Sequence, residues 1–443
     1  MAFSSIPFLV FFLPVFLAAY FATPGTAAKN AVALLASLLF YAWGEPQYLA
    51  LLLYAIAGNY AAALVIDRLD GGWRRAALAL ALAGDLLLLG RFKYAAFAGL
   101  LPAVALPLGI SFYVFHCMSY LIDVQRRRLP ANRNPLEIAL YIALFPQLIA
   151  GPIVRYGTVA RQLRRRRHRL AVASAGMRIF IIGLAQKVLL ADQVAPLADT
   201  AFAGTPGTAD AWLGLLAYTQ QIYFDFAGYS AMAVGLGLIL GFTLPRNFRL
   251  PYISRSLTEF WRRWHMSLSR WLRDYLYIPL GGNRGPRWRT WSNLVIVFLL
   301  CGLWHGAAWT FVLWGVWHGA FLAAERAGLS RLLGRLPAPL AWGYAMLAVM
   351  GGWVLFRAPD LAAAGGYFAA LAGRHGGSLS FAMHMALTPL ATLALAVGGV
   401  LAVVPRWPAA PAVLDTAWTV ALLALTALFV AAGTYSPFLY FRF

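Results

Sequence analysis

The 443-residue chain carries 36 lysine and arginine residues against 15 aspartate and glutamate residues, which gives a formal net charge of +21. Hydrophobic residues make up 62% of the chain and charged residues only 12%, whereas soluble domains average about 45–50% apolar and about 25% charged residues. This composition excludes a water-soluble globule and a disordered chain. A nucleic-acid-binding protein would carry its positive charge on a soluble body, so we expect a polytopic membrane protein with its arginines in cytoplasmic loops.

The N-terminal apolar run, residues 6–22, is predicted to be a retained first span. A secretory signal peptide would begin with a basic region, and the first basic residue here is Lys29. The two cysteines, Cys117 and Cys301, both lie in apolar runs and show no paired spacing. We therefore expect two buried thiols and neither a disulfide framework nor a cysteine-based metal site.

Apolar runs continue along the whole chain, and the sequence predicts one membrane domain over residues 1–443. A membrane helix needs about 20 apolar residues, and several runs are too short or too interrupted, so we expect about ten to thirteen true spans. Interruptions such as Pro107 and Gly151 are tolerated at membrane depth where protein or a water-filled cavity satisfies the backbone. The candidate spans are residues 6–22, 30–43, 48–66, 76–90, 94–106, 108–124, 136–152, 174–190, 212–224, 227–243, 291–304, 306–324, 340–356, 385–404 and 413–432.

The arginines gather in separate groups between the apolar runs, at residues 68–75, 126–133, 155–169, 246–289 and 326–335. The positive-inside rule predicts that these loops are cytoplasmic. The ordinary explanation of the densest group, residues 155–169, is a topology signal that also contacts anionic lipid headgroups. The alternative is an electrostatic landing site for an anionic donor or its carrier.

The segment from Pro251 to Leu280 is predicted to be one amphipathic helix lying in the plane of the membrane interface. Aromatic and apolar side chains recur in it at i, i+3, i+4 and i+7 spacing, and arginines occupy the other side. A histidine on the aromatic side needs a polar partner or a cavity. The aromatic face would hold Trp261, Trp264, His265, Leu268, Leu272 and Tyr275, and the basic face Arg262, Arg263, Arg270 and Arg273.

Two Trp-His-Gly triplets lie inside the apolar stretch 293–319 and contribute His305 and His318. An ionisable residue inside a membrane span indicates a functional site by default. On one unbroken helix the two histidines would be separated by about 20 Å of rise and about 220° of rotation. The glycines within and between the triplets favour a break or a close helix contact instead.

General-base catalysis is the chemistry that these histidines favour. Metal binding would want ligands at i, i+3 or i+4 spacing, which His265, His305 and His318 lack. A proton pump would need several carboxylates within its membrane spans, and few acidic residues besides Asp225 lie in or near the apolar runs of this chain. No Ser-His-Asp arrangement is evident. A single histidine suffices for acyl transfer to an external hydroxyl, and we expect His305 to be that base.

The chain resembles the membrane-bound O-acyltransferases, specifically the branch of bacterial alginate O-acetyltransferase membrane subunits. The resemblance covers nearly the whole chain, and its most specific block runs from Phe260 to Gly319. It implies an all-α polytopic bundle with re-entrant and interfacial helices around a central tunnel, and a catalytic core at about residues 107–325. The matching strings are residues 107–123 (PLGISFYVFHCMSYLID), 145–156 (FPQLIAGPIVRY), 224–237 (FDFAGYSAMAVGLG), 245–284, 302–319 and 437–443 (PFLYFRF).

The resemblance also implies roles for the histidines. His305 matches the catalytic histidine of the family, His265 matches its second active-site polar position, and His318 matches a further recurring histidine. At the position after Gly228-Tyr229-Ser230 the branch usually has aspartate, whereas this chain has Ala231, so that carboxylate is either absent or replaced by Asp225.

The resemblance implies acyl transfer across the bacterial inner membrane, with no bound cofactor. The donor would be acetyl-CoA or another acyl thioester, such as an acyl carrier, on the cytoplasmic side. The acceptor would be an extracytoplasmic polysaccharide such as alginate, reached through a periplasmic SGNH-type acetyltransferase. Besides these partners we expect contact with membrane lipids, and neither metal nor nucleic acid.

In this mechanism His305 takes the hydroxyl proton during attack on the thioester carbonyl, and His265 orients the acyl group or stabilises developing charge. Four tryptophans, Trp261, Trp264, Trp304 and Trp309, would wall the tunnel and exclude water. Arg262, Arg263, Arg270 and Arg273 would meet donor phosphates or anchor the segment at the interface. The alternatives are a D-alanyl or peptidoglycan O-acyltransferase subunit, and a transporter for a lipid-linked sugar, which would require inverted repeats.

Overall fold

The computed structural model describes residues 2–102, 104–404 and 412–433, and within these ranges the chain consists of helices and loops without a strand. The all-α prediction is therefore confirmed. Residue contacts divide the chain into two compact units. Unit 1 comprises Met1–Leu184 and Tyr229–Arg246, and unit 2 comprises Ala185–Gly228 and Asn247–Phe443. The predicted C-terminal string 437–443 lies outside the described residues.

Six helical stretches within the described residues are long and apolar enough to cross a membrane: Thr26–Gly44, Pro46–Arg68, Leu170–Phe202, Thr208–Ile239, Ala338–Arg357 and Val413–Ala431. Three shorter apolar helices are Pro7–Ala22, Leu361–Leu371 and Pro389–Val403. Six is fewer than the predicted number of spans, because glycine and proline divide several of the apolar runs. The predicted span 108–124, for example, folds as α5 (Ile110–Gln125), a 16-residue helix that follows a left-handed Gly109.

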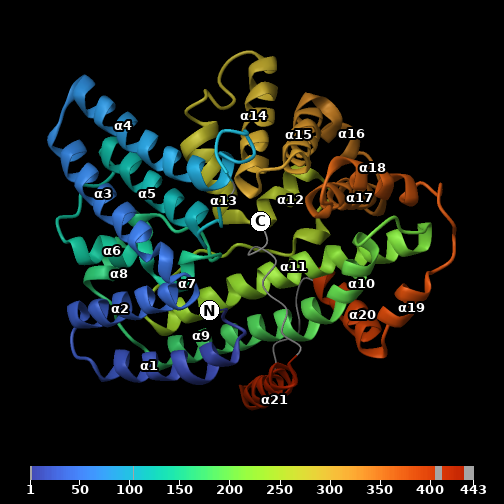
Figure 1. The fold of residues 1–443 in the computed structure, drawn as a ribbon, viewed down its shortest axis with the longest axis horizontal. Helices are drawn as coiled ribbons and strands as arrows, with labels where there is room; N and C mark the ends of the chain where they lie inside the picture. Colours follow the sequence, from blue (N-terminus) through green and yellow to red (C-terminus); the bar gives the residue numbers. More distant parts are fainter. Residues whose placement is uncertain (1, 103, 405–411, 434–443) are drawn as a thin grey trace. The chain divides into compact units, whose positions relative to one another are not determined.

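In unit 1 several short and long helices pack against α5 (Ile110–Gln125). Both α3 and α4 pack against α5 and against each other, as Figure 1 shows. The aromatic rings of Phe3, Phe8, Phe40 and Phe145 form a second buried cluster, with ring centroids 4.9–6.2 Å apart. The remaining elements are η1 (Pro7–Phe12), α1 (Leu13–Ala22), α2 (Thr26–Gly44), η2 (Pro46–Tyr48), α3 (Leu49–Arg68), α4 (Gly71–Leu89), η3 (Gly90–Tyr94), α6 (Pro135–Ala143), α7 (Phe145–Leu148), α8 (Tyr156–Arg164) and α9 (Leu170–Ala185).

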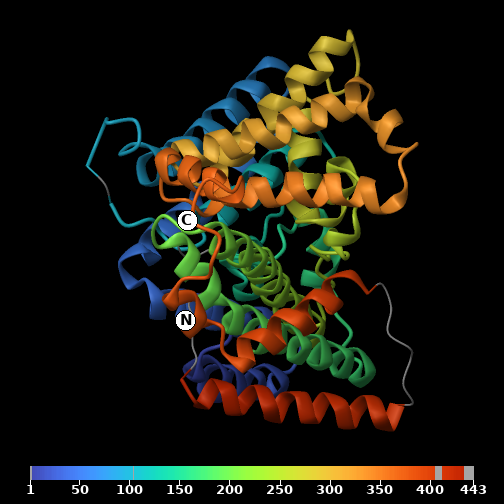
Figure 2. The ribbon, with the colours of Figure 1, turned by 90° about the vertical axis from the view of Figure 1, so that its right-hand side faces the viewer.

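In unit 2 the central feature is a helical hairpin, in which α14 (Arg287–His305) and α15 (Trp309–Ala324) pack closely together and α15 packs on α17 (Ala338–Arg357), as Figure 2 shows. The other elements are η4 (Gln186–Ala191), α10 (Asp192–Phe202), α11 (Thr208–Ile239, which ends in unit 1), η5 (Pro251–Ile253), α12 (Leu257–Arg263), α13 (Met266–Leu272), η6 (Arg273–Tyr277), η7 (Glu325–Leu329), α16 (Ser330–Leu333), α18 (Leu361–Leu371), α19 (Phe381–Ala386), α20 (Pro389–Val403) and α21 (Ala412–Ala431).

Glycine makes the hairpin possible, which confirms the predicted break and close contact at the Trp-His-Gly triplets. The chain is extended at Gly306 and Ala308, between the two helices. A Cβ atom on Gly302 would collide with the carbonyl oxygen of Phe311, and one on Gly315 would collide with that of Phe298. The helix backbones can approach this closely only because both positions lack a side chain.

The prediction of one unbroken helix over 251–280 is wrong. The backbone is extended at Trp264 and left-handed at His265, where φ is 42°, so α12 ends before this point and α13 begins after it. Periodicity alone does not reveal such a break. The predicted division into faces is confirmed, since all six members of the aromatic face are buried, whereas Arg262, Arg270 and Arg273 are exposed.

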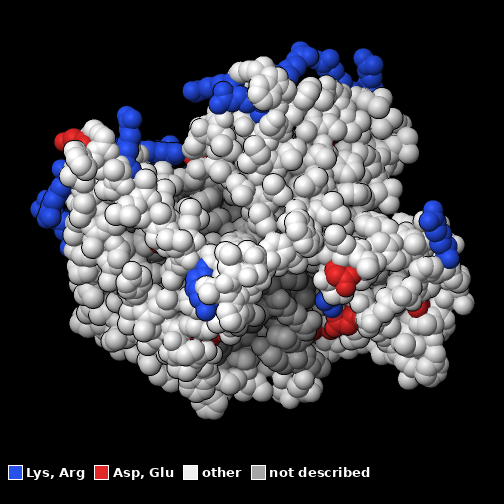
Figure 3. Space-filling model, turned by 45° about the horizontal axis from the view of Figure 1, so that its top comes forward, with Lys and Arg blue, Asp and Glu red and all other residues white. Residues whose placement is uncertain are grey.

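The face of the molecule drawn in Figure 3 is largely uncharged, and its lysine and arginine side chains stand mainly near the rim. Loop arginines between apolar spans produce this distribution.

Candidate active site

The hairpin brings two of the three predicted histidines into one aromatic cluster. His305 is the last residue of α14 and is 5% exposed, and His318 lies in α15 and is fully buried. The Trp314 ring stands between them, with its centroid 5.2 Å from the His305 ring and 4.8 Å from the His318 ring. Phe356 of α17 also packs on His305, at 5.2 Å, and its ring contacts that of Trp314 at 5.5 Å.

A hydrogen bond to one ring nitrogen of His318 fixes the tautomer of its imidazole. Its Nδ1 accepts a hydrogen bond from the indole Nε1 of Trp261 in α12, at 3.3 Å. An accepting Nδ1 leaves the proton of the neutral ring on Nε2. That Nε2 has no hydrogen-bond partner among the described residues, and it faces Gly352, where a Cβ atom would lie 2.6 Å away. The neutral tautomer therefore presents a buried N–H donor beside a position without a side chain.

His265 occupies a strained position between α12 and α13. It is one of three residues other than glycine with positive φ in the described part of the chain, and it is fully buried. Such a backbone conformation costs about 1–3 kcal/mol and persists only where the surroundings enforce it. The imidazole packs edge-on against Phe226, with ring centroids 4.7 Å apart, and lies 6.2 Å from the Trp304 ring. Burial lowers the pKa of His265 to about 3, so the ring is neutral at neutral pH.

Asn247 enforces the break at His265. Its carbonyl oxygen accepts from the amide of Met266 at 2.9 Å, and its side-chain oxygen accepts from the amide of Ser267 at 3.2 Å. These amides belong to the first turn of α13, which has no side-chain cap of its own. Asn247 is 2% exposed, so both hydrogen bonds are shielded and replace the helix bonds that the break removes.

Glu325, at the end of α15, anchors α12 beneath the histidine cluster. Its carboxylate accepts from the amide of Leu257 at 2.6 Å, the amide of Thr258 at 2.9 Å and the hydroxyl of Thr258 at 2.6 Å. The hydroxyl of Tyr344 in α17 donates to it at 3.2 Å. Glu325 is 1% exposed, and a carboxylate at a helix N-terminus satisfies amides that lack helix partners. It thus joins the helix that carries His318 to the helix that carries Trp261.

A buried ion cluster lies on a neighbouring part of unit 2. The Nζ of Lys187 is 2.6 Å from Asp192 and 2.7 Å from Asp225, and all three side chains are at most 5% exposed. The residue after Asp225 is Phe226, whose ring packs on His265. The cluster therefore fixes the part of α11 that contacts His265.

Comparison with known proteins decides the family. The family model described as the membrane-bound O-acyltransferase family matches residues 110–352. The chain belongs to this family. The matched range contains all three histidines and Glu325.

Relatives of this O-acyltransferase have named activities. The chain is 46% identical over 416 residues to a probable alginate O-acetylase of Azotobacter vinelandii, covering 89% of this chain and 83% of the relative. It is 43% identical to the Pseudomonas putida protein of the same name over the whole of both chains. It is 36% identical to a peptidoglycan O-acetyltransferase of Helicobacter pylori over 84% of this chain and 80% of that one. The protein is thus a multi-pass membrane O-acyltransferase.

The structure of the O-acyltransferase buries the three predicted histidines in unit 2 together with three of the four predicted tryptophans, whereas none of the four predicted arginines is buried. Trp261, Trp264 and Trp304 are 7%, 2% and 5% exposed, whereas Trp309 is 63% exposed at the start of α15. The predicted role of Trp309 as a wall of the tunnel stays a prediction. Asp225 belongs to the ion cluster with Lys187.

Two of the four predicted phosphate-binding arginines are held by carboxylates. Arg263 pairs with Glu259 at 2.8 Å and Arg273 pairs with Asp274 at 2.6 Å, whereas Arg262 and Arg270 are exposed. Among the described residues of the enzyme, no three histidine, cysteine or acidic side chains are grouped as a metal ion would require.

Sequence reasoning missed Glu325, Asn247 and Lys187. A usable signal existed for Lys187, because it is one of only three lysines and lies inside the apolar run 174–190. Glu325 and Asn247 carried no local signal, since their partners are 67 and 20 residues away.

Proposed function

We propose that the enzyme transfers an acetyl group from a cytoplasmic acyl thioester, acetyl-CoA or an acylated carrier, for O-acetylation of an extracytoplasmic polysaccharide of the alginate type. His305 is the general base of this reaction. The observation that carries the proposal is the position of His305, a nearly buried imidazole at a helix end, enclosed by Trp304, Trp314 and Phe356.

The proposed chemistry is a single displacement at the thioester carbonyl. His305 accepts the proton of the acceptor hydroxyl while that oxygen attacks the carbonyl carbon. The new C–O bond forms, the C–S bond breaks, and the imidazolium returns the proton to the departing thiolate. The rings around His305 limit water, which would otherwise hydrolyse the thioester. A neutral His265 orients the acyl group, and the His318 Nε2–H is a donor suited to the developing oxyanion.

The proposed acceptor rests on similarity to the named relatives. Two relatives named as probable alginate O-acetylases are 43% and 46% identical to this chain, which supports an alginate-type polymer. The proposed location is the bacterial inner membrane. A periplasmic SGNH-type acetyltransferase would complete the transfer to the polymer. Peptidoglycan is the second candidate acceptor, because the Helicobacter pylori relative matches 84% of this chain. The match to the teichoic acid D-alanyltransferase of Bacillus subtilis covers only 45% of this chain.

The decisive experiment replaces His305 with alanine and measures acetyl transfer. Membranes containing the protein and its neighbouring periplasmic acetyltransferase are supplied with acetyl-CoA labelled in the acetyl group and with deacetylated alginate. We expect His305→Ala to lower polymer labelling by about 100-fold or more, the usual contribution of a general base. Labelling from acetyl-CoA by the wild type also tests the donor.

Two histidine variants control for nonspecific loss. His384 is exposed, and His384→Ala should label polymer at the wild-type rate. His116 is buried in unit 1, where its Nε2 accepts from the amide of Val154, so His116→Ala tests the cost of losing a buried histidine. A His305→Ala protein that is inserted at normal levels and still labels the polymer overturns the assignment. If the wild-type protein labels peptidoglycan and not alginate, the assigned acceptor changes and the rest of the proposed function stands.

A further inference from the structure

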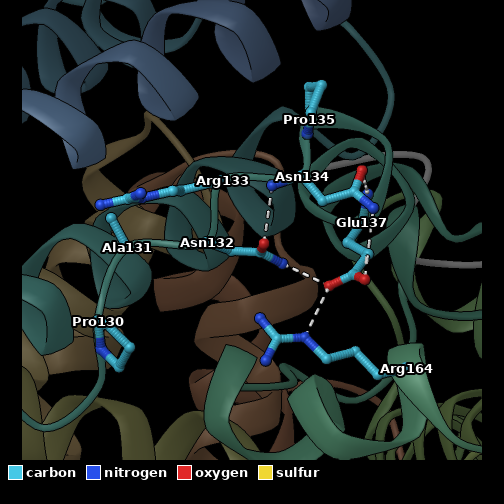
Figure 4. A pocket seen from close by; sticks show the side chains of 8 residues that line it. All are labelled: Pro130, Ala131, Asn132, Arg133, Asn134, Pro135, Glu137 and Arg164. Carbon is cyan, nitrogen blue, oxygen red and sulfur yellow. Dashed lines mark hydrogen bonds and ion pairs between the residues drawn. The ribbon is translucent and has the colours of Figure 1, made fainter.

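A hollow in unit 1, lined partly by charged and amide side chains, lies outside the histidine cluster and has no role in the chemistry above. It is bounded by the loop from Pro130 to Pro135, the start of α6 and the end of α8, and its volume is about 710 Å³ (Figure 4). A second hollow of about 430 Å³ shares Pro130 and Arg164 with it and adds Arg161 and Arg165. Each volume lies within the range of about 300–1,000 Å³ that is typical of ligand pockets.

The floor of the first hollow is a fixed hydrogen-bond network centred on Asn132, which is 4% exposed. Its amide nitrogen donates to Glu137 and to the Tyr156 hydroxyl, each at 2.6 Å. Its side-chain oxygen accepts from the amide of Asn134 at 2.9 Å. The loop is thereby tied to α6 and α8 before any ligand arrives, which lowers the entropy cost of binding.

The one carboxylate in the hollow is already neutralised. Glu137 accepts from Asn132 and from the Nε of Arg164 at 3.3 Å, and in Figure 4 both side chains point toward it. Arg164, whose side chain also hydrogen-bonds Tyr156, lines both hollows. Glu137 therefore orients an arginine and does not repel an anion.

The remaining arginines of the two hollows keep their charge available. Arg133, Arg161 and Arg165 are exposed, and none of them pairs with a carboxylate among the described residues. The lining of the two hollows thus contains four arginines and one glutamate, and its formal net charge is +3. Guanidinium groups bind phosphate through paired N–H donors, so this lining suits a ligand with several phosphate charges.

We propose that these two hollows form a binding site for a phosphate-bearing ligand, whose phosphates are held by Arg161, Arg164 and Arg165. Under the proposed function, on which this part rests, the ligand is the nucleotide end of the CoA-type donor. An anionic phospholipid offers the same phosphate chemistry through its headgroup. The experiment below separates these two sources.

The test measures binding to the purified full-length protein in detergent. The double variant Arg161→Gln/Arg165→Gln removes two charges from the hollows and leaves the Arg164–Glu137 pair intact. Its matched control is Arg167→Gln/Arg169→Gln, which removes the same charge from exposed residues that line neither hollow. Calorimetric titration with coenzyme A gives the Kd of each protein. Thermal unfolding in nanodiscs of phosphatidylglycerol or phosphatidylcholine reports the contribution of the lipid.

We expect the Kd for coenzyme A to rise at least tenfold in Arg161→Gln/Arg165→Gln and less than twofold in the control. If coenzyme A binding is unchanged and only the stabilisation by phosphatidylglycerol is lost, the site stands and its ligand is a lipid headgroup. Equal losses in the two double variants overturn the proposal, because charge alone would then account for the effect. The absence of any loss in both variants, with coenzyme A and with phosphatidylglycerol, overturns it as well, because the two arginines would then bind neither ligand.

The His305→Ala protein separates this inference from the proposed function. It should bind coenzyme A as the wild type does even if its transfer activity is lost. If the wild type uses acetyl-CoA, while Arg161→Gln/Arg165→Gln binds coenzyme A normally and keeps its stabilisation by phosphatidylglycerol, the site is refuted and the proposed function stands.

Discussion

The two regions described above bury polar groups in opposite ways. Under the hollow of unit 1, Asn132, Glu137 and Tyr156 are held by direct hydrogen bonds of 2.6 Å. In unit 2, His265 and His305 are enclosed mainly by aromatic rings, with Phe226, Trp304, Trp314 and Phe356 at centroid distances of 4.7–6.2 Å.

The difference shows what each region is built to do. A hydrogen-bonded network fixes its members and leaves their polar atoms committed, which suits a rigid floor. Aromatic contacts fix the plane of an imidazole while leaving ring nitrogens able to exchange a proton with a substrate. Substitutions in the hydrogen-bonded floor of unit 1 should therefore act on stability and ligand binding, and substitutions of the ring-enclosed histidines of unit 2 should act on turnover.

Glu325 provides the largest expected effect, because it supports the histidine core by hydrogen bonds. Glu325→Ala leaves the amides of Leu257 and Thr258 and two hydroxyls without their acceptor in a buried site. We expect a loss of about 3 kcal/mol or more in the free energy of unfolding, since each unsatisfied buried group costs about 1–3 kcal/mol. Thermal unfolding of the purified protein measures this.

The variant Glu325→Gln distinguishes the effect of Glu325 on the position of α12 from its effect on the stability of the fold. It retains an acceptor oxygen, so the fold should survive while α12 and Trp261 shift, and polymer labelling should fall about tenfold with a smaller loss of stability. Thr258→Val removes only one donor to Glu325 and serves as the matched control. Full activity in Glu325→Gln would show that the anchor does not position the site.

Substitution of Asn132 should have an intermediate effect, and it tests the hydrogen-bonded floor of the hollow in unit 1. Asn132→Ala removes the bonds to Glu137 and Tyr156 but keeps its backbone amide bond to the Tyr120 hydroxyl. We expect about 1–2 kcal/mol of destabilisation. The KM for the donor should rise several-fold, and kcat at saturating donor should stay within about twofold of the wild type. A fall in kcat with unchanged KM would contradict the division of labour between the regions.

Trp309 provides the smallest expected effect and sharpens the boundary of the histidine core. Because 63% of this residue is exposed, Trp309→Ala should change stability by less than about 0.5 kcal/mol and labelling by less than about twofold. Trp304→Ala is the positive control, since Trp304 is 5% exposed and its ring lies 4.9 Å from that of His305. Equal losses of polymer labelling in Trp309→Ala and Trp304→Ala would show that Trp309 belongs to the site.

Much of this arrangement could be predicted from the sequence, and the exceptions have one cause. The periodicity of 251–280 correctly separated buried aromatic residues from exposed arginines, and the glycines around His305 correctly indicated a break. The left-handed His265 could not be predicted, because Asn247, outside the periodic segment, stabilises it. The role of Glu325 likewise depends on a contact made 67 residues away.

The ion cluster of unit 2 has a consequence for the order in which the protein is made. Lys187 and Asp192 lie five residues apart on one continuous helical stretch, Leu170–Phe202, so their 2.6 Å pair can form as soon as that stretch coils. A lone charge at the centre of a helix costs about 2.5–3.5 kcal/mol to insert, and internal pairing reduces this cost. Asp225 emerges later from the ribosome, on α11, and finds Lys187 already in the bilayer. The cluster is therefore completed by a carboxylate that is synthesised after the Lys187–Asp192 pair.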